Sequence, residues 1–117
     1  MCIRDSRGSD GHTDFGYRSG QDLANSTSDQ IISFNANVDN YSSGSGILHL
    51  FSPSDTTFVK HFICETHSDA QTSAEQGLIQ SFFSAGYINS TSAVNALTFK
   101  FSSGNIDAGD ILLFGLN

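Results

Sequence analysis

The strongest constraint on the fold of this chain is a hydrophobic alternation with a period of two residues. In residues 31–38, "IISFNANV", apolar side chains alternate with Ser and Asn, which is the pattern of a strand with one buried face. Further strand-like runs lie at 46–53, 56–66, 76–88, 95–103 and 111–116. Short strands without a strong helical segment predict an all-β protein, namely an antiparallel β-sandwich of jelly-roll type.

The run at 76–88, "QGLIQSFFSAGYI", has two interpretations. Leu78 and the two Phe residues that follow it also fit the spacing of a helix. We favour a strand, because Gly77 and Gly86 bracket the run and aromatic side chains suit a pleated surface.

The last two runs predict a hairpin. "NALTFKFSS" at 95–103 alternates, and "ILLFGL" at 111–116 is apolar on both sides. The turn between them contains Gly104 and Gly109, which suit positions with positive φ. A strand paired in a sheet is one way in which such an apolar segment stays ordered.

Composition and charge exclude several classes of function. Twelve acidic against five basic residues give a net charge of -7, so we predict no nucleic-acid binding, which depends on clusters of Lys and Arg. The longest apolar stretch is far below the roughly 20 residues of a membrane helix, and we predict no membrane insertion. Ten of the twelve acids are Asp, a residue that favours turns.

The first residues, "MCIRDS", match the translation of a transposon end used to tag DNA for sequencing. We therefore interpret residues 1–6 as sequencing adapter and residues 7–117 as the C-terminal part of one sandwich domain that is incomplete at its N-terminal side. The cysteines make no disulfide framework. We expect Cys64, within "HFICETH", to be a small buried hydrophobe and not a reactive thiol.

Two groups of residues are candidates for a metal site. His61, Glu65 and His67 share one strand face by parity, but a strand spreads them over roughly 20 Å at about 3.3 Å per residue. The segment "DGHTD", with Asp10 and Asp14, is shorter than an EF-hand calcium loop and has no terminal Glu. No nucleophile elbow occurs, so we predict no enzyme, no catalytic residue, no metal and no cofactor.

Two long segments carry a resemblance to a known family. "SGSGILHLFSPSDTTFVKHFI" and "GYINSTSAVNALTFKFSSGNIDAGDILLFGLN" resemble a β-sandwich domain that recurs at the C-terminal ends of tailed-phage virion and tail-fibre-like proteins, many from marine metagenomes. The similarity covers roughly residues 44–117. The matching positions are Gly46, Ser52, Pro53, Gly86, Tyr87, Asn89, Ser90, Thr91, 102–106 and Gly109. Upstream, "RGSDGHTDFGYRSGQ" resembles the family's loop after an early strand, with His12 in place of a second Gly.

The resemblance implies a virion component that contacts a glycan or protein of the host cell surface. We expect the contact to come from the loops "DGHTDFGYRSG" and "DNYSSGSG", because binding residues concentrate on loops. Two alternatives stay open: a fibre-capping or trimerisation domain without receptor binding, and a carbohydrate-binding module of a surface-polysaccharide enzyme. The resemblance also implies a homotrimer formed through an upstream region. The candidate contact residues are Asp10, His12, Tyr17, Arg18 and Tyr41.

Overall fold

The computed structural model describes residues 2–9, 12–17, 19–24, 26–33, 43–72 and 75–116. Residues 2–9, 12–16, 70–72 and 75–78 are described by their backbone alone. These ranges contain strands and one short 3-10 helix, η1 (Ser19–Gln21), and no α-helix. The prediction of an all-β chain is therefore confirmed for the described residues.

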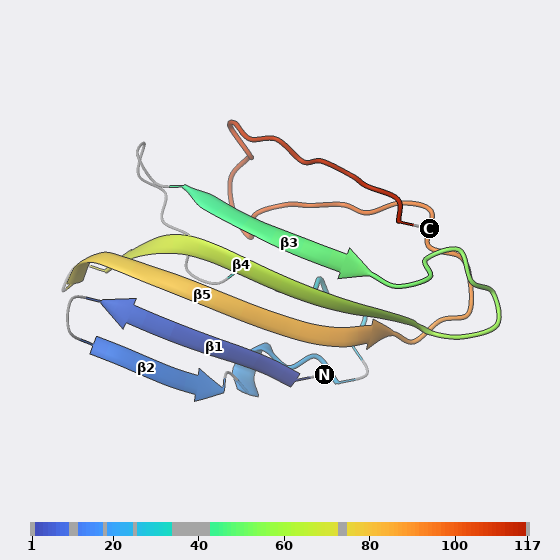
Figure 1. Cartoon of the computed structure of the whole chain (residues 1–117), viewed down its shortest axis with the longest axis horizontal. Helices are drawn as coiled ribbons and strands as arrows, with labels where there is room; N and C mark the ends of the chain where they lie inside the picture. Colours follow the sequence, from blue (N-terminus) through green and yellow to red (C-terminus); the bar gives the residue numbers. More distant parts are fainter. Residues whose placement is uncertain are drawn as a thin grey trace.

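The described strands form one five-stranded antiparallel sheet of order β2-β1-β5-β4-β3. Figure 1 shows the long β4–β5 hairpin in the middle, with β3 at one edge and β2 at the other. The sheet is built around this hairpin, because every other strand joins one of its outer sides directly or through β1. The strands are β1 (Cys2–Ser9), β2 (His12–Tyr17), β3 (Gly44–Leu50), β4 (Lys60–Thr72) and β5 (Glu75–Ile88).

Three predicted strands are confirmed with shifted ends. The run at 46–53 becomes β3, which stops before the Ser52–Pro53 corner, and the run at 56–66 becomes the longer β4. The ambiguous run at 76–88 is the strand β5 and not a helix. Its pairing with β4 on one side and β1 on the other explains the outcome, since a helix would leave both neighbours without a ladder.

Burial alternates along β4 and β5, so the sheet has two unlike faces. We call the covered face the one formed by the even-numbered residues of β3, β4 and β5. Cys64 and Phe82 are 2% and 1% exposed there, and polar side chains are buried with them. The buried polar residues are Lys60, Ser68, Gln80 and Ser84.

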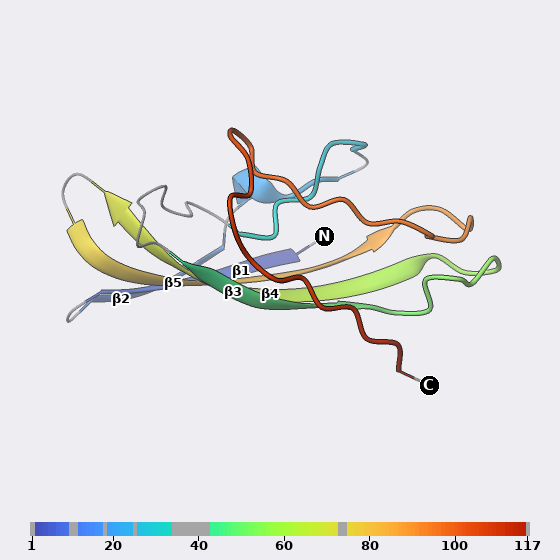
Figure 2. The ribbon, with the colours of Figure 1, turned by 90° about the horizontal axis from the view of Figure 1, so that it is seen from above.

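The covered face is overlaid by two segments without strand pairing, residues 26–33 and 89–101, which we call the covering layer. Figure 2 shows both on the same side of the sheet. Thr66 donates from Oγ1 to the carbonyl oxygen of Ile32 at 2.6 Å. An ion pair between Lys100 and Asp29, 2.7 Å apart, joins the two segments. The covering layer is therefore bonded to the sheet, and its own two segments are bonded to each other.

The 89–101 segment is held at its beginning by Lys60. The buried ammonium donates to the carbonyl oxygens of Ser90 at 3.2 Å and Ser92 at 2.7 Å. Two residues further on, the Val94 N–H donates to the carbonyl oxygen of Pro53 at 2.7 Å. These bonds bring the segment back over the sheet immediately after β5.

The predicted hairpin of 95–103 and 111–116 is wrong, because neither run is a strand among the described residues. Gly104 and Gly109 do have positive φ, at 79° and 143°. Contacts elsewhere separate the two arms: the first is held in the covering layer, and the second runs alongside the outer edge of β3 (Figures 1 and 2). Residues 31–33 of the predicted strand at 31–38 are not strand either, and 34–38 lie outside the described residues.

The segment predicted as the loop "DGHTDFGYRSG" is also corrected, because His12–Tyr17 form β2. Ser9 pairs with His12 in the ladder between β1 and β2. The missed signal is the Asp-Gly pair at 10–11, which favours a two-residue hairpin connection. Residues 2–6, interpreted as adapter, lie in β1; their origin stays a prediction.

Candidate functional site

The second face of the sheet is the candidate site, because it exposes large side chains. We call it the open face, and Figure 1 views the molecule from this side. Ile47 and Ile79 are 64% and 66% exposed, Tyr87 is 51% exposed and Phe83 is 39% exposed. The odd-numbered residues of β3, β4 and β5 with described side chains form this face: Ser45, Ile47, His49, His61, Ile63, Glu65, His67, Asp69, Ile79, Ser81, Phe83, Ala85 and Tyr87.

The strand register places aromatic and polar groups of the open face next to each other. His61 lies opposite Tyr87 on β4 and β5, with ring centroids 6.2 Å apart and planes inclined by 46°. On the next strand His49 stacks on Phe51, with centroids 6.5 Å apart and planes at 19°. The face therefore offers flat rings beside groups that can form hydrogen bonds.

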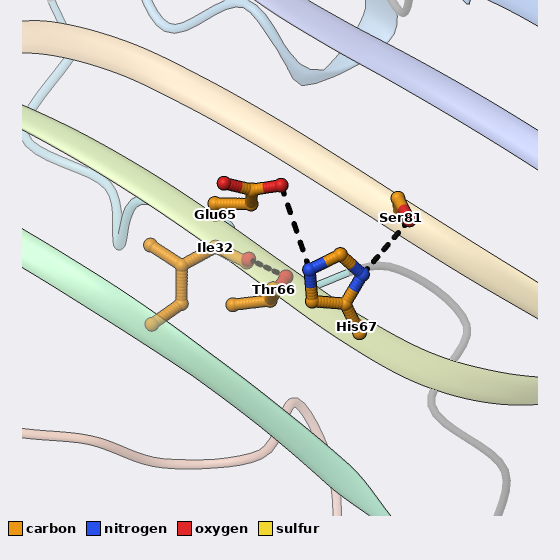
Figure 3. A network of polar contacts seen from close by, with 5 residues as sticks. All are labelled: Ile32, Glu65, Thr66, His67 and Ser81. Atoms are coloured by element: carbon orange, nitrogen blue, oxygen red, sulfur yellow. Dashed lines mark hydrogen bonds and ion pairs between the residues drawn. The ribbon is translucent and has the colours of Figure 1, made fainter.

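A polar network occupies the centre of the open face. Figure 3 shows His67 between Ser81 and Glu65: Nδ1 is 2.8 Å from the Ser81 hydroxyl, and Nε2 is 3.5 Å from Glu65 Oε1. Both side chains of the His67–Glu65 pair are about half-exposed, so the pair contributes little to stability. The network fixes the orientation of the imidazole across β4 and β5.

A serine, a histidine and a carboxylate in this order resemble a nucleophilic relay, but the surroundings oppose that interpretation. Ser81 lies in the interior of β5, paired with His67 on one side and with Ser6 on the other. The backbone N–H groups near it belong to the ladders, whereas acyl transfer needs free donors aimed at a developing oxyanion. We interpret the network as a cross-strand polar contact.

The three candidate metal ligands of β4 share one face of the strand, as predicted, but they take part in two separate contacts. Glu65 and His67 meet in the central network, whereas His61 lies toward the Tyr87 end of the face. Across the described part of the chain, no group of three or more His, Cys, Asp or Glu side chains converges to hold a metal ion.

The predicted contact residues are not brought together by the described structure. Tyr17 is 55% exposed and donates from its hydroxyl to Asp22 Oδ2 at 2.6 Å, which stabilises the turn through η1. His12 is placed in β2 by its backbone. Asp10, Arg18 and Tyr41 lie outside the described residues.

The covered face has one thiol, and it is structural. Cys64 is a free cysteine, and burial raises the pKa of its thiol. A raised pKa leaves less of the reactive thiolate at neutral pH. The prediction of a buried hydrophobe is confirmed.

The open face is not among the contact surfaces predicted above, although the sequence contains a signal for it. The runs that became β4 and β5 are apolar on both sides, and a strand facing water on one side alternates cleanly. Ile63 and Phe83 on the odd positions already indicated a second contact surface.

Comparison with known proteins adds no assignment: no family model, no curated protein and no solved structure matches the chain. Among the described residues, no helix is long and apolar enough to cross a membrane.

Proposed function

We propose that this protein is a structural and attachment module of a phage virion appendage, and that its open face contacts a neutral glycan of the host cell surface. The observation that carries the proposal is the open face itself, in which exposed rings lie beside polar groups. Sugar rings stack on aromatic planes, and hydroxyls bond to side chains such as those of His67 and Ser81.

The charge distribution favours a neutral ligand. The chain has a net charge of -7, and Glu65 is exposed within the open face. An acidic polysaccharide would be repelled by this surface. Among the described open-face residues of β3, β4 and β5 none is Lys or Arg, and Arg4 of β1 is the basic residue that the register places opposite Phe83.

The virion assignment rests on the resemblance to tail-fibre-like domains, and the Ser52–Pro53 corner supports it. Ser52 has φ 48°, a conformation that Asn also tolerates, and the family has Asn or Ser before Pro at this corner. A virion location and a homotrimer remain part of the proposal.

The sandwich architecture belongs to the same proposal. Both segments of the covering layer lie on one side of the sheet (Figure 2), as the second layer of a sandwich does, and most of the 89–101 segment runs along the β3 side (Figure 1). Its residues 95–101 contain alternating apolar side chains. In this view the layer is the second half of a jelly-roll-like sandwich, and the sheet presents its outer face to the ligand.

Binding of the full chain to glycan arrays and to host cells tests the function. We expect Tyr87→Ala and Phe83→Ala to lower binding at least about tenfold, because each removes a ring of the open face. Tyr17→Ala compares the β2 edge of the same side of the sheet, since Tyr17 is 55% exposed and Tyr87 51%, and the register joins Tyr17 to Phe83 through Arg4.

Two outcomes would contradict the proposal. Binding that is lost in Tyr17→Ala and kept in Tyr87→Ala would move the contact from the central strands to the β2 edge of the sheet. Binding that none of the three substitutions changes would leave a capping or trimerisation role as the better interpretation.

A further inference from the structure

We infer that residues 111–116 of one copy pair with the outer edge of β3 in a second copy, so that the protein assembles by strand addition. The inference is independent of the ligand of the open face. It rests on three features of the described residues. Residues 111–116, the donor segment, have no strand pairing; the outer edge of β3, the acceptor edge, has none either; and the contact between them buries apolar area.

The donor segment is apolar, extended and exposed. Five of the residues in 111–116 are large hydrophobics with exposed fractions between 66% and 89%. In the described chain, residues 111–116 form no backbone hydrogen bond with another segment. Such a segment, with strand-forming residues and no charge, is the kind that adds to a sheet edge. Its hydrophobic members are Ile111, Leu112, Leu113, Phe114 and Leu116.

The acceptor is the outer edge of β3, which among the described strands pairs only with β4. Phe51 donates its N–H to the His61 carbonyl, and the Asp69 N–H donates to the Ser43 carbonyl. Because the direction of backbone groups alternates along an antiparallel strand, the odd residues of β3 face β4. The groups of Gly44, Gly46, Leu48 and Leu50 therefore point outward.

The segment does not satisfy the edge of its own chain. It runs alongside β3, but Figure 2 shows it crossing the level of the sheet, from the side of the covering layer to the side of the open face. A strand that adds to an edge must instead lie in the plane of the sheet, at about 4.8 Å from its neighbour. A second copy supplies the same segment without this constraint.

The area of the contact supports the assembly together with the main-chain hydrogen bonds of the added strand. Because side chains alternate between the two faces, two or three of the five are buried on the covered side, and they remove about 120–360 Å² of apolar surface from the donor at about 60–120 Å² each. The acceptor loses at most a similar area. A two-fold dimer, the simplest closed arrangement, contains two such contacts and buries about 480–1,440 Å², whose upper part overlaps the range of about 1,200–2,000 Å² for a typical specific interface.

Light scattering of the full chain over a range of concentrations tests the inference. We expect a dimer or another closed oligomer, and we expect Ile111→Asp to raise the dissociation constant at least about tenfold. Ile79→Asp is the matched control, because Ile111 and Ile79 are both 66% exposed and only Ile111 belongs to the donor segment. Circular dichroism checks that both variants keep the strand content.

Amide hydrogen exchange locates the contact. The outward N–H groups of Leu48 and Leu50 should exchange at least about tenfold more slowly as concentration rises, and Ile111→Asp should abolish the slowing. The His49 N–H, which faces β4, is the internal control and should stay protected throughout.

Three results would overturn the inference. The first is a monomer at every concentration. The second is protection of Leu48 that does not depend on concentration, which would mean closure within one chain. The third is an oligomer that Ile79→Asp dissociates and Ile111→Asp does not, which would place the interface on the open face.

Discussion

The Lys60 ammonium donates to the carbonyl oxygen of Ser92 at 2.7 Å, although 32 residues separate them along the chain. Lys60 is 1% exposed, so its charge is stabilised by backbone carbonyls and not by water. The bond attaches the covering layer to the first residue of β4. A lysine thereby takes a position that an apolar side chain would normally occupy.

Replacing Lys60 by Met should lower the free energy of unfolding by about 2–4 kcal/mol. Met has a similar length, but it leaves the carbonyls of Ser90 and Ser92 without this donor. Chemical denaturation measures the change. Lys100→Met is the control, because the exposed pair with Asp29 contributes less than about 1 kcal/mol. Equal losses in the two variants would contradict the role given to Lys60.

Gly46→Ala should destabilise the protein by about 1–3 kcal/mol. A Cβ at this position would lie 2.6 Å from Thr66 Cγ2 and 2.7 Å from the Glu65 carbonyl oxygen, and a backbone atom within a ladder cannot move aside cheaply. Gly44→Ala, on the same strand, is the control, since its nearest contact would be 3.5 Å. A melting temperature of Gly46→Ala equal to that of Gly44→Ala would contradict this packing.

Ser52→Asn should raise the free energy of unfolding by about 0.5–1 kcal/mol, because Asn tolerates the left-handed conformation better than Ser. The φ of Ser52 is 48°. Ser54→Asn is the control, because Ser54 lies in the same exposed turn but does not itself have a positive φ, and thermal melts measure both. A destabilised Ser52→Asn variant would show that the serine hydroxyl has a role that the backbone does not reveal.

Asp55 should make stability depend on pH in the acid range. The N–H groups of Thr57, at 2.5 Å, and Phe58, at 3.0 Å, hold the pKa of its carboxyl below the ordinary value of 3.8. A depressed pKa in the folded state stabilises the protein above pH 3.8, and this stabilisation is lost as the pH falls through the folded-state value.

Denaturation curves between pH 2 and pH 6 measure the Asp55 effect. Asp55→Asn keeps the acceptor oxygen but removes the titration, so its stability should fall less steeply with acid. Asp107→Asn is the control, because Asp107 is an exposed carboxyl in the 102–110 segment. The prediction fails if the Asp55→Asn and unsubstituted curves have the same slope below pH 4.

The sequence predicted the strands β3, β4 and β5, and it missed β1 and β2. The β3, β4 and β5 strands follow from their β-branched and aromatic residues, from the glycines that bracket the run at 76–88, and from Pro53 as a stop. In each case the signal lies within a few residues of the element, and pairing with a neighbouring strand reinforces it. The buried Cys64 was predictable for the same reason, because it lies between apolar neighbours in β4.

Contacts between distant segments account for the failures. Residues 95–101 alternate like a strand, but the bonds of Lys60 to Ser90 and Ser92 and of Val94 to Pro53 start the segment in the covering layer, away from the edge of the sheet. Lys60 itself has no sequence signal for burial, because lysines are almost always exposed. Apolar residues on both sides of β4 and β5 indicate the open face in the sequence. Which of its side chains lie next to each other depends on the register of β3, β4 and β5, and the sequence does not predict that register.

The attachment of the covering layer by a few separate bonds has a consequence for the reactivity of the protein. Such a layer can open while the β4–β5 hairpin stays paired, and opening would expose Cys64 to solvent. In a Cys2→Ser background, the rate at which a thiol reagent modifies Cys64 should therefore report how often the layer opens. Lys60→Met should raise the modification rate of Cys64 at least about tenfold. This increase should exceed the one expected from the loss in the free energy of global unfolding alone. A rate that follows global stability alone would mean that layer and sheet separate only when the whole molecule unfolds.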